Sequence, residues 1–327
     1  MKLSELIAYR NLLLTMDADD IEYNAVRKLA DILYVVKTSV IQPRSFTQTL
    51  GEDNDAIINS FKDFKITLAG IVHELNAMIE VAEKTYYTES SNLYQQVSGR
   101  YCESSAAENE SVNQQILDRR LVMTPETQRM LADRIKSYAD WKYSALIIRP
   151  GRETFINDMV GFDPLYLVDS SAELLAPSYA GFTTEYQNRL RVYTDLPLSA
   201  NVLTGVPKNQ LGLCLAFNFF EFTPIEVVVQ YLKEIFSKLR PGGILAMTFN
   251  DCDRAHCVAL VERNYCFYTP GQRVRDAAKA LGYKQIFSWN DANNLTWLEL
   301  QKPGEFESLK GGQTLAKIIP KSLAKPK

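Results

Sequence analysis

The chain has 327 residues, 46% of them apolar and 23% charged, and a formal net charge of −3 at pH 7. This length predicts about two domains, and the composition is close to that of an average globular protein, which excludes a disordered chain, a collagen-like chain and a small disulfide scaffold. No apolar stretch approaches the ~18 residues that span a bilayer, and the N-terminus lacks the pattern of a signal peptide. We therefore expect a cytoplasmic protein without a membrane partner.

The two parts of the chain differ in charge. Residues 1–140 carry 15 basic and 21 acidic residues, a net charge of −6, whereas the remainder carries 21 basic and 18 acidic residues, a net charge of +3. Neither part has the strongly basic face of a dedicated nucleic-acid-binding protein, so we do not expect a nucleic-acid partner. The five cysteines show no CxxC spacing and only two histidines accompany them. No metal site is therefore predicted, although Cys252, His256 and Cys257 lie close together in the sequence.

The first 140 residues have the apolar spacing of helices. Residues 3–15 and 19–40 each predict a helix. A further helix is predicted at Thr124, where Thr-Pro-Glu supplies a cap, a proline at the first helical position and an acid in the first turn. We interpret residues 1–140 as an all-α accessory domain whose helices pack within the chain, with a homo-oligomer through these helices as the alternative. Between the second and last helices, apolar residues recur at steps of three and four and predict a longer helix: Phe61, Phe64, Leu68, Ile71, Leu75, Met78 and Ala82.

From Tyr143 onwards, apolar runs of strand length alternate with helical patterns, which favours a parallel sheet with crossover helices. One helix is predicted over 224–239, ended by a turn at Arg240–Gly243, and another over 269–281, closed by Gly282. The last two strands are close enough in sequence to form a hairpin-like pair. The seven expected strands are Ser144–Ile148, Leu165–Val168, Leu190–Tyr193, Leu211–Phe217, Ile244–Phe249, Lys284–Ser288 and Thr296–Leu300.

Two segments carry a resemblance to a known family. In FTPIEVVVQYLKEIFSKLRPGGILAMTF a helix, a Pro-Gly-Gly turn and the fifth strand follow one another, and YTPGQRVRDAAKALGYKQIFSW supplies the next helix, a glycine turn and the sixth strand. With these segments, residues 141–303 resemble the class I S-adenosylmethionine-dependent methyltransferases. The resemblance implies an α/β fold, a Rossmann-like seven-stranded mostly parallel sheet after the all-α domain, and S-adenosyl-L-methionine as cofactor. Residues 304–327 lie beyond it, and we expect a flexible Lys-rich tail there.

The resemblance also implies which residues bind the cofactor. The family's glycine-rich loop after the first strand corresponds here to Arg149–Glu153, which has a single glycine, Gly151, and an arginine where an acidic residue is common. Asp169 follows the second strand, 18 residues beyond Gly151, and matches the acid that binds the ribose hydroxyls in both type and spacing. The resemblance implies that Ser170, the next residue, binds the cofactor as well. Asp169 and Ser170 also fit a helix cap, which is the alternative interpretation.

Further candidates follow the third, fourth and fifth strands. The resemblance implies that Asp195 contacts the adenine, with a turn-forming aspartate as the alternative, and that Asn218 lies at the cofactor. Glu221, in the aromatic segment after the fourth strand, is a candidate base or substrate-orienting acid. After the fifth strand, Asp251 is a candidate for orienting a substrate amine and His256 for acting as a base, with a solvated helix-capping loop as the alternative.

Two functions of different classes are consistent with these features. The first is a methyltransferase that acts on a small molecule or a protein, because catalysis in this fold depends largely on aligning the reacting atoms. The second is a catalytically inactive methyltransferase-like scaffold or assembly protein, which the single glycine of the loop at Arg149–Glu153 suggests. Asp169 and the polar segment Asn250–Arg254 favour the enzyme.

Overall fold

The computed structural model describes residues 2–15, 66, 68–90, 124–150, 155–170, 172–194, 202–263, 266–290 and 296–304. Its internal contacts divide the chain into two compact units. The first comprises Met1–Thr88 and Asp253–Glu262, and the second comprises Glu89–Cys252 and Arg263–Lys327. The helix expected over 19–40 and the tail expected after residue 304 lie outside the described residues. No helix in the described part of the chain combines the length and the apolar character that crossing a bilayer requires.

The first unit contains three described helices. α1 spans Leu3–Leu14 and confirms the helix predicted over 3–15, another helix covers 68–90, and α9 spans Ala255–Val261. In the helix over 68–90, Leu75 is fully buried, and the other described members of the predicted apolar stripe are half-buried: Leu68, Ile71, Met78 and Ala82. The stripe is thus confirmed from Leu68 onwards, whereas Phe61 and Phe64 lie outside the described residues.

The carboxylate of Glu262, from the C-terminal half of the chain, caps the first turn of α1. The Glu262 carboxylate accepts hydrogen bonds from the Ser4 backbone N–H (2.9 Å) and from the Ser4 hydroxyl (2.8 Å). Ser4 lies in the first turn of α1, where the N–H groups have no partner within the helix. The Asn11 amide donates to the Asp253 carbonyl oxygen (2.9 Å) at the other end of α1. These three bonds fasten α1 to the segment that carries α9, a helix that the sequence did not indicate.

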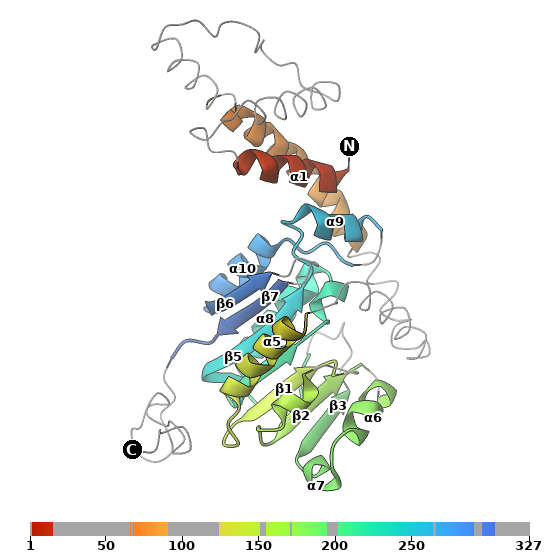
Figure 1. Ribbon diagram of the computed structural model, residues 1–327, viewed down its shortest axis with the longest axis vertical. Helices are drawn as coiled ribbons and strands as arrows, with labels where there is room; N and C mark the ends of the chain where they lie inside the picture. The colour runs from red at the N-terminus through yellow and green to blue at the C-terminus, as the bar shows by residue number, and fades with distance from the viewer. Residues whose placement is uncertain are drawn as a thin grey trace, which may run out of the picture. The chain divides into compact units, whose positions relative to one another are not determined.

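The second unit is built on a seven-stranded sheet in the order β3-β2-β1-β4-β5-β7-β6. Neighbouring strands are parallel from β3 to β5, whereas β7 runs antiparallel to both β5 and β6 (Figure 1). This arrangement confirms the predicted mostly parallel, Rossmann-like sheet and the hairpin-like pairing of its last two strands. The strands are β1 Ser144–Ile148, β2 Leu165–Asp169, β3 Leu190–Thr194, β4 Leu211–Ala216, β5 Leu239–Phe249, β6 Lys284–Asn290 and β7 Thr296–Gln301.

Helices cover both faces of this sheet, which is why its central strands are buried throughout. Every residue of β1, β2 and β4 is buried, as expected for a parallel sheet with helices on both sides. α5 lies in front of the sheet in Figure 1 and α8 behind it. The helices of the unit are α5 Pro125–Tyr138, α6 Ala172–Ala180, α7 Thr184–Gln187, α8 Ile225–Lys238 and α10 Gly271–Ala280, with the short 3₁₀ helices η1 Ile156–Met159 and η2 Phe220–Phe222.

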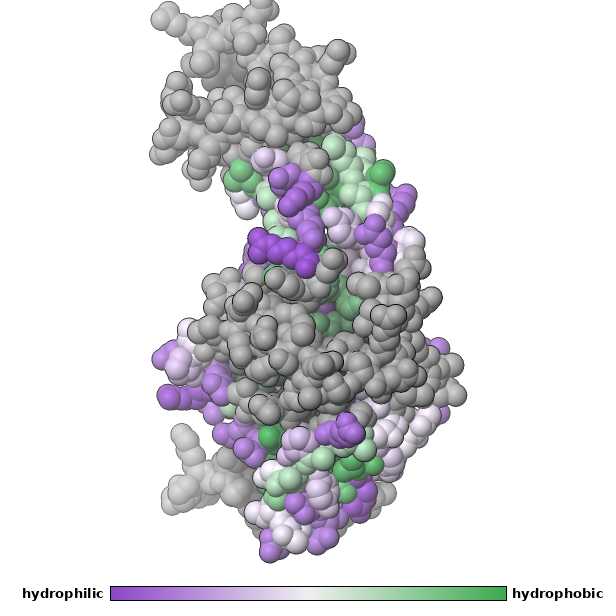
Figure 2. Space-filling view, turned by 90° about the vertical axis from the view of Figure 1, so that its right-hand side faces the viewer, coloured by the Kyte–Doolittle hydropathy of each residue, from purple (hydrophilic) through white to green (hydrophobic). Residues whose placement is uncertain are grey.

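The edge strand β3 is protected against pairing with another chain. The Arg191 guanidinium donates to the carbonyl oxygens of Asn188 (3.0 Å), two residues before the strand, and of Leu190 (2.9 Å), the first residue of the strand. A charged side chain that occupies edge carbonyls is a recognised way of blocking strand addition. Figure 2 looks at the right-hand side of Figure 1, the side where β3 and α6 lie, and polar and apolar surface residues are intermixed there.

The predicted turn at Arg240–Gly243 is wrong, because this segment belongs to β5. α8 ends at Lys238 and β5 begins at Leu239. The Gly242 N–H donates to the Lys302 carbonyl oxygen (2.8 Å), and the Lys302 N–H donates to the Gly243 carbonyl oxygen (2.9 Å). These bonds extend the sheet through the proline and glycines, and the ladder with β4 shifts register there. The helix closed by Gly282 is confirmed, and Gly282 has the left-handed φ of 94° expected after a helix.

α5 begins as predicted and is part of the second unit. The Thr124 side chain accepts from the Thr127 backbone N–H, and Pro125 is the first helical residue. Leu131 and Ile135 are fully buried in the core on one face of the sheet. Phe155, directly after the segment that follows β1, is also fully buried there, and its ring packs edge-to-face on Phe217 and Trp297.

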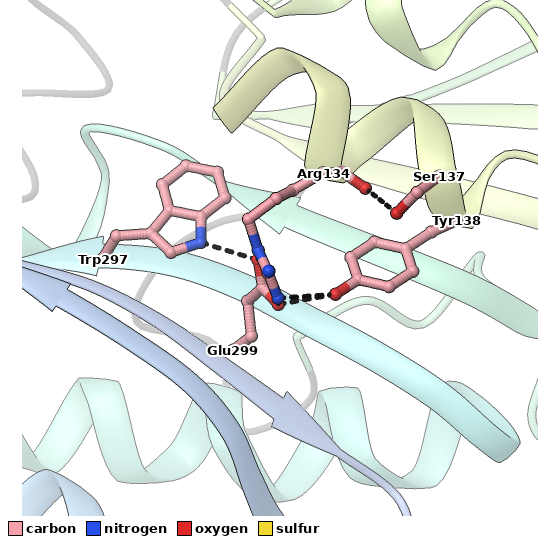
Figure 3. Close-up of polar contacts among 5 residues, drawn as sticks. All are labelled: Arg134, Ser137, Tyr138, Trp297 and Glu299. Carbon is pink, nitrogen blue, oxygen red and sulfur yellow. Dashed lines mark hydrogen bonds and ion pairs between the residues drawn. The ribbon is translucent and has the colours of Figure 1, made fainter. Parts of the chain in front are cut away.

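A buried ion pair fixes α5 to β7 (Figure 3). The Glu299 carboxylate is fully buried and takes both donors of the Arg134 guanidinium, the Tyr138 hydroxyl (2.7 Å) and the Trp297 indole N–H (3.0 Å). Burial alone raises the pKa of Glu299, but the hydrogen bonds from Arg134, Tyr138 and Trp297 outweigh it and lower that pKa. The Arg134 guanidinium also stacks 3.6 Å from the centre of the Phe287 ring. Every oxygen of the carboxylate is thus satisfied, and the cluster has a structural role.

Candidate functional site

The order of the strands marks one place where a ligand can bind. In the order β3-β2-β1-β4-β5 the chain moves outward from β1 in one direction and then returns to add β4 on the other side. The crossover connections that follow β1 and β4 therefore leave in opposite directions. In open α/β sheets, ligands bind in the crevice that this reversal creates at the carboxyl ends of the strands. The candidate site is therefore the carboxyl edge of β1 and β4.

Both strands at this reversal are followed by a non-glycine residue with left-handed backbone. Arg149 follows β1 with a φ of 53°, and Asn218 follows β4, after Phe217, with a φ of 54°. Side chains other than glycine rarely adopt this left-handed conformation, and such strain persists only where neighbouring groups enforce it. Here the Arg149 N–H donates to the Val168 carbonyl oxygen (2.6 Å), and the Asn218 N–H donates to Thr248 Oγ1 (2.7 Å).

The side chains of Arg149 and Asn218 lie at the carboxyl edge of β1 and β4. The Arg149 guanidinium carbon lies 5.8 Å from the centre of the Phe222 ring, in the segment that follows β4. Asn218 Oδ1 is buried and has no hydrogen-bond partner among the residues that the structure describes. A buried amide oxygen without a partner is costly in a folded protein, so this atom is a candidate ligand-binding group.

Asp169 is the last residue of β2, the strand next to β1 on the other side, and is 7% exposed. Its Oδ1 accepts hydrogen bonds from the Ser170 N–H (2.7 Å) and the Ser170 hydroxyl (3.3 Å). These bonds turn the chain away from the sheet shortly before α6 begins at Ala172. The residue has the position expected of an acid that binds ribose hydroxyls, and the local capping interpretation is compatible with it.

The segment after β4 combines an aromatic core with a buried acid. Phe219 and Phe220 pack on Tyr231 of α8, with ring centres 5.0 and 5.9 Å away, so these two rings belong to the core. Glu221 is 2% exposed within η2, and its backbone oxygen accepts from the Phe267 N–H (3.1 Å). Glu221 is therefore a buried carboxylate three residues beyond the strained Asn218.

The Asp251 carboxylate is held by residues of α10, within the second unit. Its carboxylate accepts from the Gly271 N–H (3.1 Å) at the start of α10 and forms an ion pair with Arg275 (3.1 Å). These contacts fix the first turn of α10 to the end of β5. His256 lies on α9 in the first unit and is exposed. Among the described residues, the structure therefore brings Asp169, Asn218 and Glu221 to the carboxyl edge of the central strands.

Two expected site residues, Gly151 and Asp195, lie outside the described residues. Thr248 was missed, although it lies on β5 one residue before Phe249 and holds Asn218 in its strained conformation. Its polar side chain within the otherwise apolar run Ile244–Phe249 was the available signal. In the described ranges, no three His, Cys, Asp or Glu side chains are grouped so as to hold a metal ion.

Comparison with known proteins finds similar chains among solved structures. No protein-family model and no curated protein matches this sequence. An O-methyltransferase family protein from Burkholderia thailandensis matches with 11% identity and a TM-score of 0.44, over 54% of this chain and 56% of that one, so the chain spans little more than half of it. A geranyl diphosphate C-methyltransferase from Streptomyces coelicolor A3(2) matches with 9% identity and a TM-score of 0.44, over 54% of this chain and 79% of that one.

A third similar structure is a chain from the complex between the Haloferax volcanii Trm112 methyltransferase activator and a candidate methyltransferase. It has 11% identity and a TM-score of 0.47, over 63% of this chain and 98% of that one. At such identities and TM-scores, the matches carry no argument about activity. The fold rests instead on the strand order and on the single antiparallel strand β7. This chain has the class I methyltransferase fold that the sequence resemblance implied.

Proposed function

We propose that this chain binds S-adenosylmethionine at the carboxyl edge of β1, β2 and β4 and transfers its methyl group to a small molecule or a protein. The observation that carries the proposal is the pair of strained residues, Arg149 and Asn218, at the point where the strand order reverses. Backbone strain of this kind clusters at functional sites.

Asp169 and Ser170 supply the proposed ribose site. The Asp169 carboxylate accepts hydrogen bonds, which is the capacity that two ribose hydroxyls require. The cofactor, when bound, supplies an activated methyl group. This chain then has to hold the two reactants in line, which accounts for much of the rate enhancement when geometry is well defined. Glu221 is the proposed proton acceptor, because it is the buried carboxylate next to the strained turn. Asp251 is not needed for this role, since its carboxylate holds Gly271 and Arg275.

A non-catalytic scaffold is the second candidate, and one specific observation favours it. The Arg149 guanidinium reaches Phe222 across the carboxyl ends of β1 and β4. It therefore lies where a glycine-rich loop would otherwise leave room for a cofactor. In a scaffold, Arg149 would fill that space permanently. In an enzyme, it would move or contribute to the binding of the ligand.

Titration calorimetry with S-adenosylhomocysteine separates the two candidates. An enzyme binds with micromolar affinity, and Asp169→Ala weakens the binding at least about tenfold, because the bonds to the ribose are lost. The matched control is Asp163→Ala, which removes a half-buried carboxylate paired with Arg189 near the opposite end of β2. It leaves the affinity unchanged. No heat from the wild-type chain, under conditions where another methyltransferase responds, refutes the cofactor site and leaves the scaffold.

A further inference from the structure

The segment between β5 and α10 leaves the second unit and returns to it. Residues up to Cys252 and from Arg263 onwards belong to the second unit, whereas Asp253–Glu262, which carries α9, belongs to the first. The Cys252 N–H donates to the Thr269 carbonyl oxygen (3.1 Å), so the chain is joined to itself on either side of this segment. The join lies beyond the carboxyl end of β5, on the edge where ligands bind in open α/β sheets. The folding of α9 therefore decides how ordered the chain is directly after β5.

α9 is too short to be stable without packing against other residues. It has seven residues, and isolated helices shorter than about 12–15 residues are marginal in water. Its N-cap residue, Arg254, makes no side-chain capping hydrogen bond, so the local stabilisation that a cap supplies is missing. The stability of α9 therefore has to come from the packing of its buried side chains, Cys257, Val258 and Val261.

α1 supplies packing for α9 and forms hydrogen bonds at both of its ends. The two helices pack directly against each other. Before α9, the Asp253 carbonyl oxygen accepts from the Asn11 amide, and after α9 the Glu262 carboxylate accepts from the N–H and the hydroxyl of Ser4. Ser4 and Asn11 lie about two helical turns apart on α1. One helix therefore holds the start and the end of α9 together, and its release removes all of these bonds at once.

We propose that α1 is a latch for residues 253–262. While α1 is docked, these residues form α9. When α1 is released, they unfold into a loop directly after β5, and the sheet and α10 stay folded. The sheet side is held independently, because the Asp251 carboxylate binds the Gly271 N–H and Arg275 within the second unit. Proteins commonly open in such local units at a lower free energy than that of global unfolding. The latch does not depend on the proposed function, and it lets α1 control the order of the segment at the carboxyl end of β5.

Hydrogen exchange in the full-length chain, followed by mass spectrometry, tests the latch. The double variant Ser4→Ala with Asn11→Ala removes a bond at each end of α9, while alanine favours the helical state of α1 itself. We expect amide exchange in α9 to accelerate about 10- to 100-fold, as for the loss of a hydrogen bond to a charged group. Exchange in β5 and α10 should stay unchanged. The matched control is Leu14→Ala, which alters an exposed side chain of the same helix and should leave exchange in α9 unchanged.

The thiol of Cys257 provides a second measurement of the same opening. This side chain lies on α9 and is fully buried, and Cys214, on β4, is fully buried as well. N-ethylmaleimide reacts only with a thiol that solvent can reach, so labelling reports how often each segment opens. In the double variant we expect labelling of Cys257 to accelerate by the same factor as exchange in α9. Cys214 is the internal reference, and its labelling should stay as slow as in the wild type.

Two results would overturn the inference. If exchange in α9 and labelling of Cys257 stay at the wild-type rate in the double variant, α9 folds independently of α1. If exchange in β5 and α10 accelerates as much as exchange in α9, α1 contributes to the stability of the whole chain and is not a latch. If the double variant does not fold, Asn11→Ala alone, which removes one bond at one end of α9, decides the question by the same two comparisons.

Discussion

The ion pair between Glu299 and Arg134 is the contact whose loss we expect to be most costly for the second unit. Glu299 is fully buried, and its two oxygens take donors from Arg134, Tyr138 and Trp297. In Glu299→Gln the shape is kept, but an amide N–H₂ replaces one acceptor and faces these donors. Removing one partner of a buried pair costs about 3–5 kcal/mol. Because the Arg134 side chain keeps 29% of its exposure to solvent, we expect about 3 kcal/mol, the lower end of that range.

Urea unfolding, followed through the fluorescence of the chain's three tryptophans, measures this cost. A double-mutant cycle built from Arg134→Met, Glu299→Leu and the double variant isolates the coupling between the two side chains. The double variant leaves the Tyr138 hydroxyl and the Trp297 indole N–H without their acceptor, so we expect it to be less stable than the wild type. If Glu299→Gln unfolds within about 0.5 kcal/mol of the wild type, the range of an ordinary surface substitution, the cluster does not fix α5 to the sheet and our reasoning is refuted.

The same cluster predicts how stability depends on pH. The pKa of Glu299 is lowered in the folded chain, so its contribution to stability is present above the unfolded value of about 4.3. That contribution is lost as the pH falls through the lower, folded pKa, because the unfolded state then binds the proton more readily. The difference in unfolding free energy between the wild type and Glu299→Gln should therefore shrink on acidification. A difference that does not change between pH 7 and acid contradicts this.

Three further substitutions test other contacts. Gly271→Ala places a methyl group against the Asp251 carboxylate, which the ion pair with Arg275 restrains. We therefore expect thermal unfolding to show a free energy of unfolding lower by about 1–3 kcal/mol. An unchanged melting temperature would show that the Asp251 side chain can shift to make room. Phe155→Ala empties a fully buried site between two rings and should cost about 3–5 kcal/mol in urea unfolding, whereas a cost below that range would mean that the site collapses. Glu262→Gln weakens the cap of α1, so hydrogen exchange in α1 should accelerate while exchange in β1 stays unchanged.

The sheet was predictable from the sequence because its strands are buried on both faces. Runs such as those of β1 and β4 consist almost wholly of apolar residues, bounded by helical patterns, and helices on both sides of a parallel sheet favour that composition. The start of α5 was predictable for a different reason, since the cap at Thr124 is a local signal. The turn expected at Arg240–Gly243 was wrong because proline and glycine report local preference, whereas backbone bonds to Lys302 make this segment a strand.

The candidate site was predictable in part. Asp169 and Glu221 were identified by residue type and by their position after a strand. Sequence spacing could not reveal that Asp251 holds the first turn of α10, because its partners, Gly271 and Arg275, lie about 20 residues further along the chain. Nor could it reveal α9, whose attachment to α1 depends on a carboxylate that caps a helix 258 residues away. Such contacts are set by the fold and have no local signature.

The depleted glycine loop counts against a cofactor site only if glycine is the sole means of forming the turn that follows β1. Glycine is common in such loops because it adopts left-handed backbone and lets a ligand approach. The structure shows that Arg149 adopts that conformation itself, with a φ of 53°, and is held there by the carbonyl oxygen of Val168. Arg149 therefore adopts without glycine the backbone conformation that glycine favours, at a cost of about 1–3 kcal/mol of strain, and its guanidinium carbon lies 5.8 Å from the centre of the Phe222 ring. Whether that guanidinium excludes a cofactor or contacts it is the question that titration with S-adenosylhomocysteine answers.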